Sequence, residues 1–146
     1  MKRRQAEILL IEDSLPDIRL TERALKSNRI PTNVNVVRDG ATAMAFLHQQ
    51  DKYSHAPRPD LILLDLALPG RNGVEVLAEI KGDPKLKRIP VVVLTSSDAP
   101  EDVLDSYDLH ANAYAKKPVD VDEFVNTIKA IEDFWLSLVI LPQEEH

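Results

Sequence analysis

Short, wholly apolar segments alternate with longer amphipathic segments along this chain, and that alternation restricts the possible folds. Three segments contain only Ile, Leu and Val: 8–11, 61–64 and 91–94. Such runs are typical of strands covered on both faces of a sheet, where no polar side chain is needed. Weaker strand candidates lie at 34–37 and 113–115. We therefore predict five strands.

An amphipathic segment follows each predicted strand. Apolar residues at helical spacing predict helices over 16–27, 41–49, 74–80 and 99–109, and a last helix that begins after the N-cap Asp120. Strands that alternate with helices of this length form parallel sheets with helices on both faces. The chain is therefore predicted to be an α/β protein with three layers, α/β/α.

Polar residues end four of the predicted strands. They are, in chain order, the pair Glu12-Asp13, then Asp65, Thr95 and Lys117. Ligands of parallel α/β sheets bind beyond the carboxyl ends of the strands. Three carboxylates gathered there oppose one another's ionisation, unless a cation compensates or a pKa rises. With a hydroxyl and an ammonium beside them, they predict a site for a hard metal ion and a phosphoryl group.

Each of these residues also has an ordinary structural explanation. Asp65 could belong to a turn, and Thr95 could cap the following segment. The pair Glu12-Asp13 could favour a helix N-terminus, and Lys117 could be a surface charge. Independent caps and surface charges have no reason to converge on one edge of a sheet. Their common position therefore favours the functional interpretation.

Composition argues against several classes of protein. A length of 146 residues suits one domain, which we place at 7–136 between an N-terminal tail at 1–6 and an apolar C-terminal extension and tail at 137–146. The net charge of −6 argues against a nucleic-acid-binding surface. There is no cysteine, no signal peptide and no apolar run long enough to span a membrane. We expect a cytoplasmic protein without nucleic-acid or membrane partners.

The chain resembles the receiver domain of two-component response regulators over about residues 7–134. The residues that carry the resemblance are Glu12-Asp13, Asp65, Pro69, Gly73, Thr95, Tyr114 and Lys117-Pro118. The resemblance implies a flavodoxin-like, doubly wound sheet of five parallel strands in the order 2-1-3-4-5. It also implies that Asp65 accepts a phosphoryl group from a histidine kinase, so that the chain is a phosphoacceptor signalling protein and catalyses only its own phosphotransfer and dephosphorylation.

The same resemblance assigns roles to the other residues. Lys117 and Thr95 would contact the phosphoryl group. Thr95 and Tyr114 would form the switch that transmits phosphorylation, although Tyr114 could also be a half-buried strand residue with no such role. The cofactor would be Mg²⁺, with Mn²⁺ or Ca²⁺ as substitutes. Its implied ligands are Asp13, Asp65, the main-chain carbonyl of Ala67 and, through a water, Glu12.

A narrower resemblance concerns three segments, 57–66, 88–95 and 131–136. They are similar to single-domain regulators that work with bacterial and cyanobacterial phytochromes. The resemblance implies a light-sensing histidine kinase as partner. Only about a dozen residues follow the last predicted helix, so we expect no DNA-binding output domain. The signal is then expected to leave by contact with another protein or by draining phosphoryl groups from a kinase.

Other classes fit the residues less well. A haloacid-dehalogenase-type phosphatase needs a second acid two residues after the nucleophile, where this chain has Ala67. A flavin carrier needs a hydroxyl- and glycine-rich phosphate loop after the first strand, where the acids of Glu12-Asp13 would repel phosphate. The four glycines form no nucleotide-binding loop. A pseudo-receiver that only binds partners typically loses the phosphoacceptor or the lysine, and this chain keeps both.

The C-terminal segment 134–141 is apolar all round. A chain of this size should not leave such a segment in water. Either it folds back over its own core or it forms a subunit interface. We favour a homodimer through the last helix and the C-terminal extension, with Phe134, Trp135 and Leu138 in the interface.

Overall fold

The computed structural model describes residues 5–26, 31–97 and 99–138. Within them, five parallel strands form one sheet in the order β2-β1-β3-β4-β5. The strands are β1 (Ala6–Ile11), β2 (Thr32–Val37), β3 (Leu61–Leu64), β4 (Val91–Thr95) and β5 (Ala113–Lys116). This order confirms the predicted doubly wound α/β fold.

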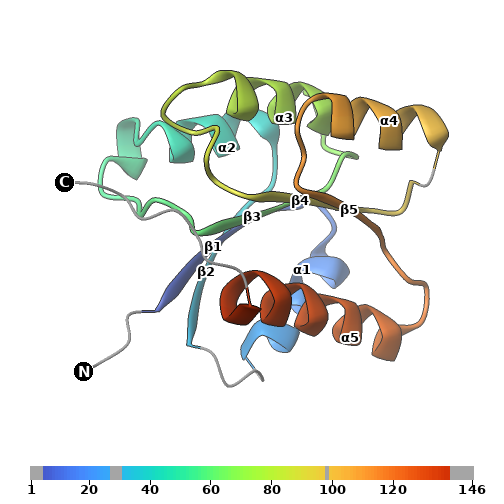
Figure 1. Cartoon of the computed structure of the whole chain (residues 1–146). Coiled ribbons are helices and arrows are strands. Elements are labelled where there is room, and N and C mark those ends of the chain that lie inside the picture. Colours follow the sequence, from blue (N-terminus) through green and yellow to red (C-terminus); the bar gives the residue numbers. More distant parts are fainter. Residues whose placement is uncertain (1–4, 27–30, 98, 139–146) are drawn as a thin grey trace.

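Helices cover both faces of the sheet (Figure 1), with α2, α3 and α4 on one face and α1 and α5 on the other. They are α1 (Leu15–Lys26), α2 (Gly40–Leu47), α3 (Gly73–Gly82), α4 (Pro100–Asp108) and α5 (Val121–Glu132). A short 3₁₀ helix, η1 (Asp51–Tyr53), follows α2, and a π-helical segment, η2 (Asp133–Leu138), continues α5. The five predicted helices are therefore confirmed in type and order.

The core is divided by the sheet, because successive side chains of a strand point to opposite faces. In β1, Leu9 and Ile11 pack with α2 and α3, whereas Ile8 and Leu10 pack with α1 and α5. All four residues of β3 are buried, two in each cluster. Burial on both faces explains why this strand is wholly apolar, and it fixes the strand ends on which the site is built.

Several boundaries differ from the sequence-based prediction. The helix expected over 41–49 ends at Leu47, and Gln49 adopts a left-handed backbone conformation with φ of 54°. Ala6, expected in the tail, is the first residue of β1, and residues 139–146 of the expected extension lie outside the described residues. No helix of the described part combines the length and the apolar character that crossing a membrane requires.

Candidate functional site

The main-chain hydrogen bonds of the sheet continue one residue beyond three of the strands. The amide of Glu12 donates to the last carbonyl of β2 (3.0 Å), that of Asp65 to the last carbonyl of β1 (3.0 Å), and that of Lys117 to the last carbonyl of β4 (2.7 Å). The three side chains therefore start from neighbouring, fixed positions at one edge of the sheet. Their convergence follows directly from the parallel register of the strands.

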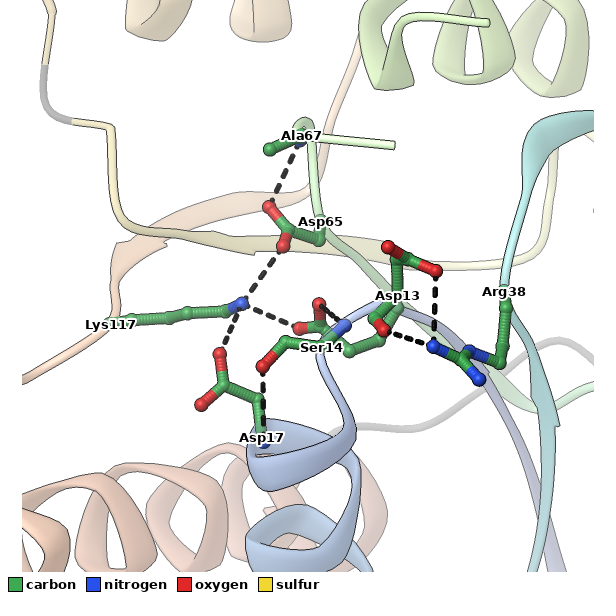
Figure 2. A network of polar contacts seen from close by, with 8 residues as sticks. Asp13, Ser14, Asp17, Arg38, Asp65, Ala67 and Lys117 are labelled. Atoms are coloured by element: carbon green, nitrogen blue, oxygen red, sulfur yellow. Dashed lines mark hydrogen bonds and ion pairs between the residues drawn. The ribbon is translucent and has the colours of Figure 1, made fainter. Parts of the chain in front are cut away.

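The ammonium of Lys117 lies at the centre of this site (Figure 2). Its Nζ is 2.6 Å from Oε1 of Glu12, 2.8 Å from Oδ2 of Asp65 and 2.8 Å from Oδ2 of Asp17. The Lys117 side chain is 6% exposed, so these contacts are largely shielded from water. Three carboxylates thus share one buried cation.

The loop after β3 is held tightly against the start of α3. Oδ1 of Asp65 accepts a hydrogen bond from the amide of Ala67 (3.1 Å), and the amide of Gly73 donates to the carbonyl of Leu66 (2.9 Å). A Cβ at position 73 would lie 2.5 Å from Cα of Leu66 and 2.6 Å from the carbonyl oxygen of Asp65. Only glycine allows α3 to begin so close to the backbone of Asp65.

Burial and shared charge shift the pKa values of the three central groups. Burial and the neighbouring Asp65 raise the pKa of Glu12 to about 7, although Lys117 opposes the rise. Burial alone would raise the pKa of Asp65 as well, but hydrogen bonds from Lys117 and the other neighbours outweigh it and lower that pKa. For Lys117, the three carboxylates overcome the effect of burial and raise the pKa. Asp65 is therefore ionised at neutral pH, as a nucleophile must be.

Asp13, the remaining predicted acid, pairs with a different cation. Arg38 directly follows β2, and its Nη2 lies 2.8 Å from the main-chain oxygen and 3.3 Å from Oδ1 of Asp13. Both side chains are about half exposed. Within the described residues, no three His, Cys, Asp or Glu side chains converge as a ready metal cage. The predicted metal-ligand set stays a prediction.

The donor set nevertheless fits a hard divalent cation. Four carboxylates, those of Glu12, Asp13, Asp17 and Asp65, face the cations of Lys117 and Arg38. When all are ionised, this cluster lacks two positive charges, which one divalent ion supplies. Carboxylate oxygens are the ligands that Mg²⁺ prefers, and Mg²⁺ usually keeps several waters, so it does not require a closed protein cage.

The two predicted switch residues lie on neighbouring strands. Thr95 is 2% exposed and contributes to the lowered pKa of Asp65 through hydrogen bonding. The hydroxyl of Tyr114 donates to the carbonyl of Ser97 (2.7 Å), and the hydroxyl of Ser97 donates to Oδ2 of Asp102 in α4 (2.5 Å). Tyr114 is thus connected through the loop after β4 to helix α4. Its role as a switch stays a prediction.

The predicted interface residues have different environments. Phe134 is 50% exposed and contacts Trp135 edge-on, with ring centroids 5.4 Å apart. Trp135 is partly buried against the cluster formed by α1, α5 and the sheet. Leu138 ends η2, and its side chain lies outside the described residues. Part of this segment therefore packs on its own core, while Phe134 faces solvent.

Sequence reasoning missed two charged residues of the site, Asp17 and Arg38. Asp17 occupies the first turn of α1, where an acid is common because it favours the helix dipole. Arg38 follows an edge strand and has no distinctive spacing. Their positions could have identified them, because Asp17 lies near the start of a predicted helix and Arg38 directly follows a predicted strand. Both of these element ends lie at the carboxyl edge of the sheet.

A buried carboxylate with an acid pair, a hydroxyl and a lysine at the carboxyl edge of a 2-1-3-4-5 sheet is the arrangement expected of a receiver domain. The chain belongs to the response regulator receiver domain family, whose model matches residues 8–129. The predicted family and function are thereby confirmed: the protein is a two-component response regulator.

Particular relatives narrow the comparison. The chain is 53% identical to the response regulator Rcp1 of Synechocystis sp. over 135 aligned residues. The alignment covers 92% of this chain and 92% of Rcp1. It is similar to the phosphorylated cyanobacterial phytochrome response regulator RcpA, with a TM-score of 0.94, 51% identity and coverage of 96% of this chain and 100% of that one. The Mn²⁺-bound form of Rcp1 gives a TM-score of 0.91 at 51% identity, covering 94% of this chain and 99% of that one.

Proposed function

We propose that Asp65 accepts a phosphoryl group from the phosphohistidine of a sensor histidine kinase. A carboxylate oxygen of Asp65 attacks phosphorus and forms a P–O bond. The P–N bond to the imidazole breaks, and the imidazole leaves with the electron pair and takes up a proton. The observation that carries this proposal is the 2.8 Å contact between Lys117 and an Asp65 whose pKa is lowered despite burial.

The surrounding side chains supply what phosphoryl transfer requires, namely positioning and neutralisation of charge. The ammonium of Lys117 orients the Asp65 carboxylate and remains beside the phosphoryl oxygens after transfer. The hydroxyl of Thr95 is placed to donate a hydrogen bond to the same group. The amide of Ala67 donates to Oδ1 of Asp65, so that the two contacts together fix the orientation of the carboxylate.

Asp13, Asp65 and the carbonyl of Ala67 would hold Mg²⁺, with Glu12 acting through a water. When bound there, the ion neutralises negative charge and links protein oxygens to phosphoryl oxygens. The Mn²⁺-bound form of the similar Rcp1 supports a divalent cation as cofactor, and Mn²⁺ or Ca²⁺ would replace Mg²⁺. Asp13 would offer the metal a carboxylate oxygen beside the one that lies 3.3 Å from Arg38.

The partner kinase is proposed to be of the phytochrome type. Support comes from the similarity to Rcp1 and to the cyanobacterial phytochrome response regulator RcpA. We place the exchange in the cytoplasm, with which a chain that lacks cysteine is compatible. The signal then passes on by protein contact.

Helix α4 is the element that Thr95 and Tyr114 would move. Among its nine residues only Ser106 is buried, while Leu104 and Tyr107 are 61% and 49% exposed. A helix with so little buried surface has low local stability and can adopt a second position at small cost. Replacing Tyr114 by Ala should therefore weaken phosphorylation-dependent partner binding while leaving phosphorylation intact; unchanged partner binding would refute the coupling.

A homodimer through the C-terminal segment is also proposed, because Phe134 exposes half of its ring next to Trp135. Sedimentation at micromolar concentration, with and without the phosphate mimic beryllofluoride, tests it. Phe134→Glu should shift the protein toward the monomer, whereas Leu104→Glu on α4 serves as the control for adding charge to an exposed apolar residue. A wild-type protein that is monomeric in both conditions would contradict the dimer.

The phosphoacceptor role is tested by incubation with acetyl phosphate and Mg²⁺, read by intact mass. Wild type should gain one phosphoryl group only when Mg²⁺ is present. Asp65→Asn should gain none, whereas Asp108→Asn, an exposed control on α4, should behave as wild type. A phosphoryl group that persists on the folded Asp65→Asn variant would place the acceptor elsewhere.

A further inference from the structure

Asp17 contacts Lys117 from a helix, whereas the other carboxylates around Lys117 follow strands of the sheet. It lies in the first turn of α1, and its Oδ2 accepts a hydrogen bond of 2.8 Å from Nζ of Lys117. Its amide is 3.4 Å from the hydroxyl of Ser14, which precedes the helix. In Figure 2, Asp17 and Asp65 approach the ammonium from different sides, Asp17 from the helix and Asp65 from the sheet.

Lys117 has no donor left for another acceptor. An ammonium carries three N–H donors, and Glu12, Asp17 and Asp65 supply three carboxylate acceptors within the described residues. A phosphoryl group on Asp65 brings oxygens to the same ammonium. The phosphoryl oxygens therefore compete with the carboxylates of Glu12 and Asp17 for the donors of Lys117.

Burial decides which contact is released. The side chains of Glu12 and Asp65 are 4% and 7% exposed, whereas that of Asp17 is 26% exposed. Once Asp65 is phosphorylated, its negative charge lies on the phosphoryl oxygens, so the comparison is between Glu12 and Asp17. A buried carboxylate that loses its cation is costly, because water cannot replace the contact. Water can solvate Asp17 when it separates from Lys117, so Asp17 is the partner that leaves at lowest cost.

We propose that Asp17 is a positioning residue that holds Lys117 in the unphosphorylated protein and is exchanged for a phosphoryl oxygen when Asp65 is phosphorylated. This rests on the phosphoacceptor function proposed above. The exchange separates the first turn of α1 from the lysine, so α1 senses the phosphoryl group directly. The negative charge of Asp17 also opposes the arrival of an anionic donor and competes with the phosphoryl group for the ammonium.

The test compares Asp17→Asn with two matched variants. Asp17→Asn removes the charge at nearly constant size, Asp17→Glu keeps the charge, and Glu22→Gln removes one charge from the same helix without touching Lys117. Each variant of the 146-residue chain is phosphorylated with acetyl phosphate and Mg²⁺. A carboxylate oxygen of Asp65 attacks phosphorus, and acetate leaves with the electrons of the broken P–O bond. Initial rates over a range of donor concentration, and the loss of the phosphoryl group after donor removal, are followed by intact mass.

Asp17→Asn should be phosphorylated roughly three- to tenfold faster than wild type and should keep its phosphoryl group longer by a similar factor, as expected for removing one charge several ångströms from the reacting group. Asp17→Glu and Glu22→Gln should stay within about twofold of wild type. An unchanged or slower Asp17→Asn would overturn the proposal, and so would an equal acceleration of Glu22→Gln.

A second measurement separates this proposal from the phosphoacceptor function. A double-mutant cycle with Asp17→Asn and Lys117→Met is measured by urea unfolding in metal-free buffer, where no phosphotransfer takes place. Non-additive unfolding midpoints support the Asp17–Lys117 contact, and additive midpoints overturn it. If the cycle is non-additive but wild type gains no phosphoryl group at Asp65, the phosphoacceptor function fails, and the proposed exchange fails with it while the contact stands.

Discussion

Replacing Glu12 by Gln should make the stability of the metal-free protein less sensitive to pH. The Glu12 side chain is 4% exposed, and burial together with Asp65 raises its pKa from 4.5 to about 7. Below pH 4.5 the carboxyl is protonated in both the folded and the unfolded state, so it does not lower the free energy of unfolding. Between pH 4.5 and 7 the folded state binds more protons than the unfolded state, and stability falls as the pH rises.

The size of this effect follows from the shift. One pKa unit corresponds to about 1.4 kcal/mol, so the change from 4.5 to about 7 amounts to about 3 kcal/mol at high pH. Most of it, about 2 to 3 kcal/mol, develops between pH 5 and pH 8. The Gln side chain has no carboxyl to ionise and resembles protonated Glu in shape. Relative to wild type, Glu12→Gln should therefore gain about 2 to 3 kcal/mol of stability over this range.

Urea unfolding at pH 5 and pH 8 in the presence of a chelator measures the difference. An exposed control, Glu75→Gln, should follow wild type at both pH values, because it removes no buried charge. Added Mg²⁺ should stabilise wild type more than Glu12→Gln at pH 8, since the variant lacks one acid of the proposed metal site. A constant difference between Glu12→Gln and wild type across the pH range would refute the reasoning, because Glu12 would then be ionised throughout.

Three further substitutions test the backbone packing, the helix cap and the lysine contact on which the site depends. Gly73→Ala should cost about 3 kcal/mol in urea unfolding, because its Cβ would lie 2.5 Å from backbone, whereas Gly82→Ala, with nothing within 4 Å, should be neutral or stabilising. Asp120→Ala should cost about 1 kcal/mol by the same assay, since it removes the side-chain cap of two amides in α5. Lys117→Met should slow phosphorylation by acetyl phosphate at least roughly tenfold, as no other cation contacts Asp65 among the described residues; a rate within twofold of wild type would show that Lys117 is dispensable.

The sequence predicted the limits of the central strand β3 better than those of the edge strand β2. The strand expected over 61–64 is found at those limits, because burial on both faces requires every residue to be apolar. The strand expected over 34–37 begins earlier, at Thr32. Its first residues are polar because β2 lies at the edge of the sheet, where Asn33 can donate to Glu7 of β1 (2.7 Å) in contact with solvent. Apolar patterning does not detect such residues.

The positions of the site residues were predictable, but their ion pairs were not. The parallel register fixes where Glu12, Asp65 and Lys117 leave the sheet, so their convergence follows from sequence pattern alone. Which carboxylate pairs with which cation depends on side-chain distances of a few ångströms. In the structure Asp13 pairs with Arg38, whereas the adjacent Glu12 pairs with Lys117, and no spacing in the sequence indicates that choice.

Asp17 shows how a helix can contribute to a site that is otherwise built from strand ends. Its neighbour Ile18 is 6% exposed and packs in the cluster between α1, α5 and the sheet, together with Leu25 later in the same helix. Packing of this apolar stripe sets the rotation of α1, and successive helical residues point about 100° apart. Once Ile18 is directed into the core, the preceding residue in the first turn is turned toward the carboxyl edge of the sheet. The burial pattern of α1 therefore places an acid beside Lys117. A charged residue next to the first buried position of a helix is, like a strand-end residue, a candidate for a site at the carboxyl edge of a parallel sheet.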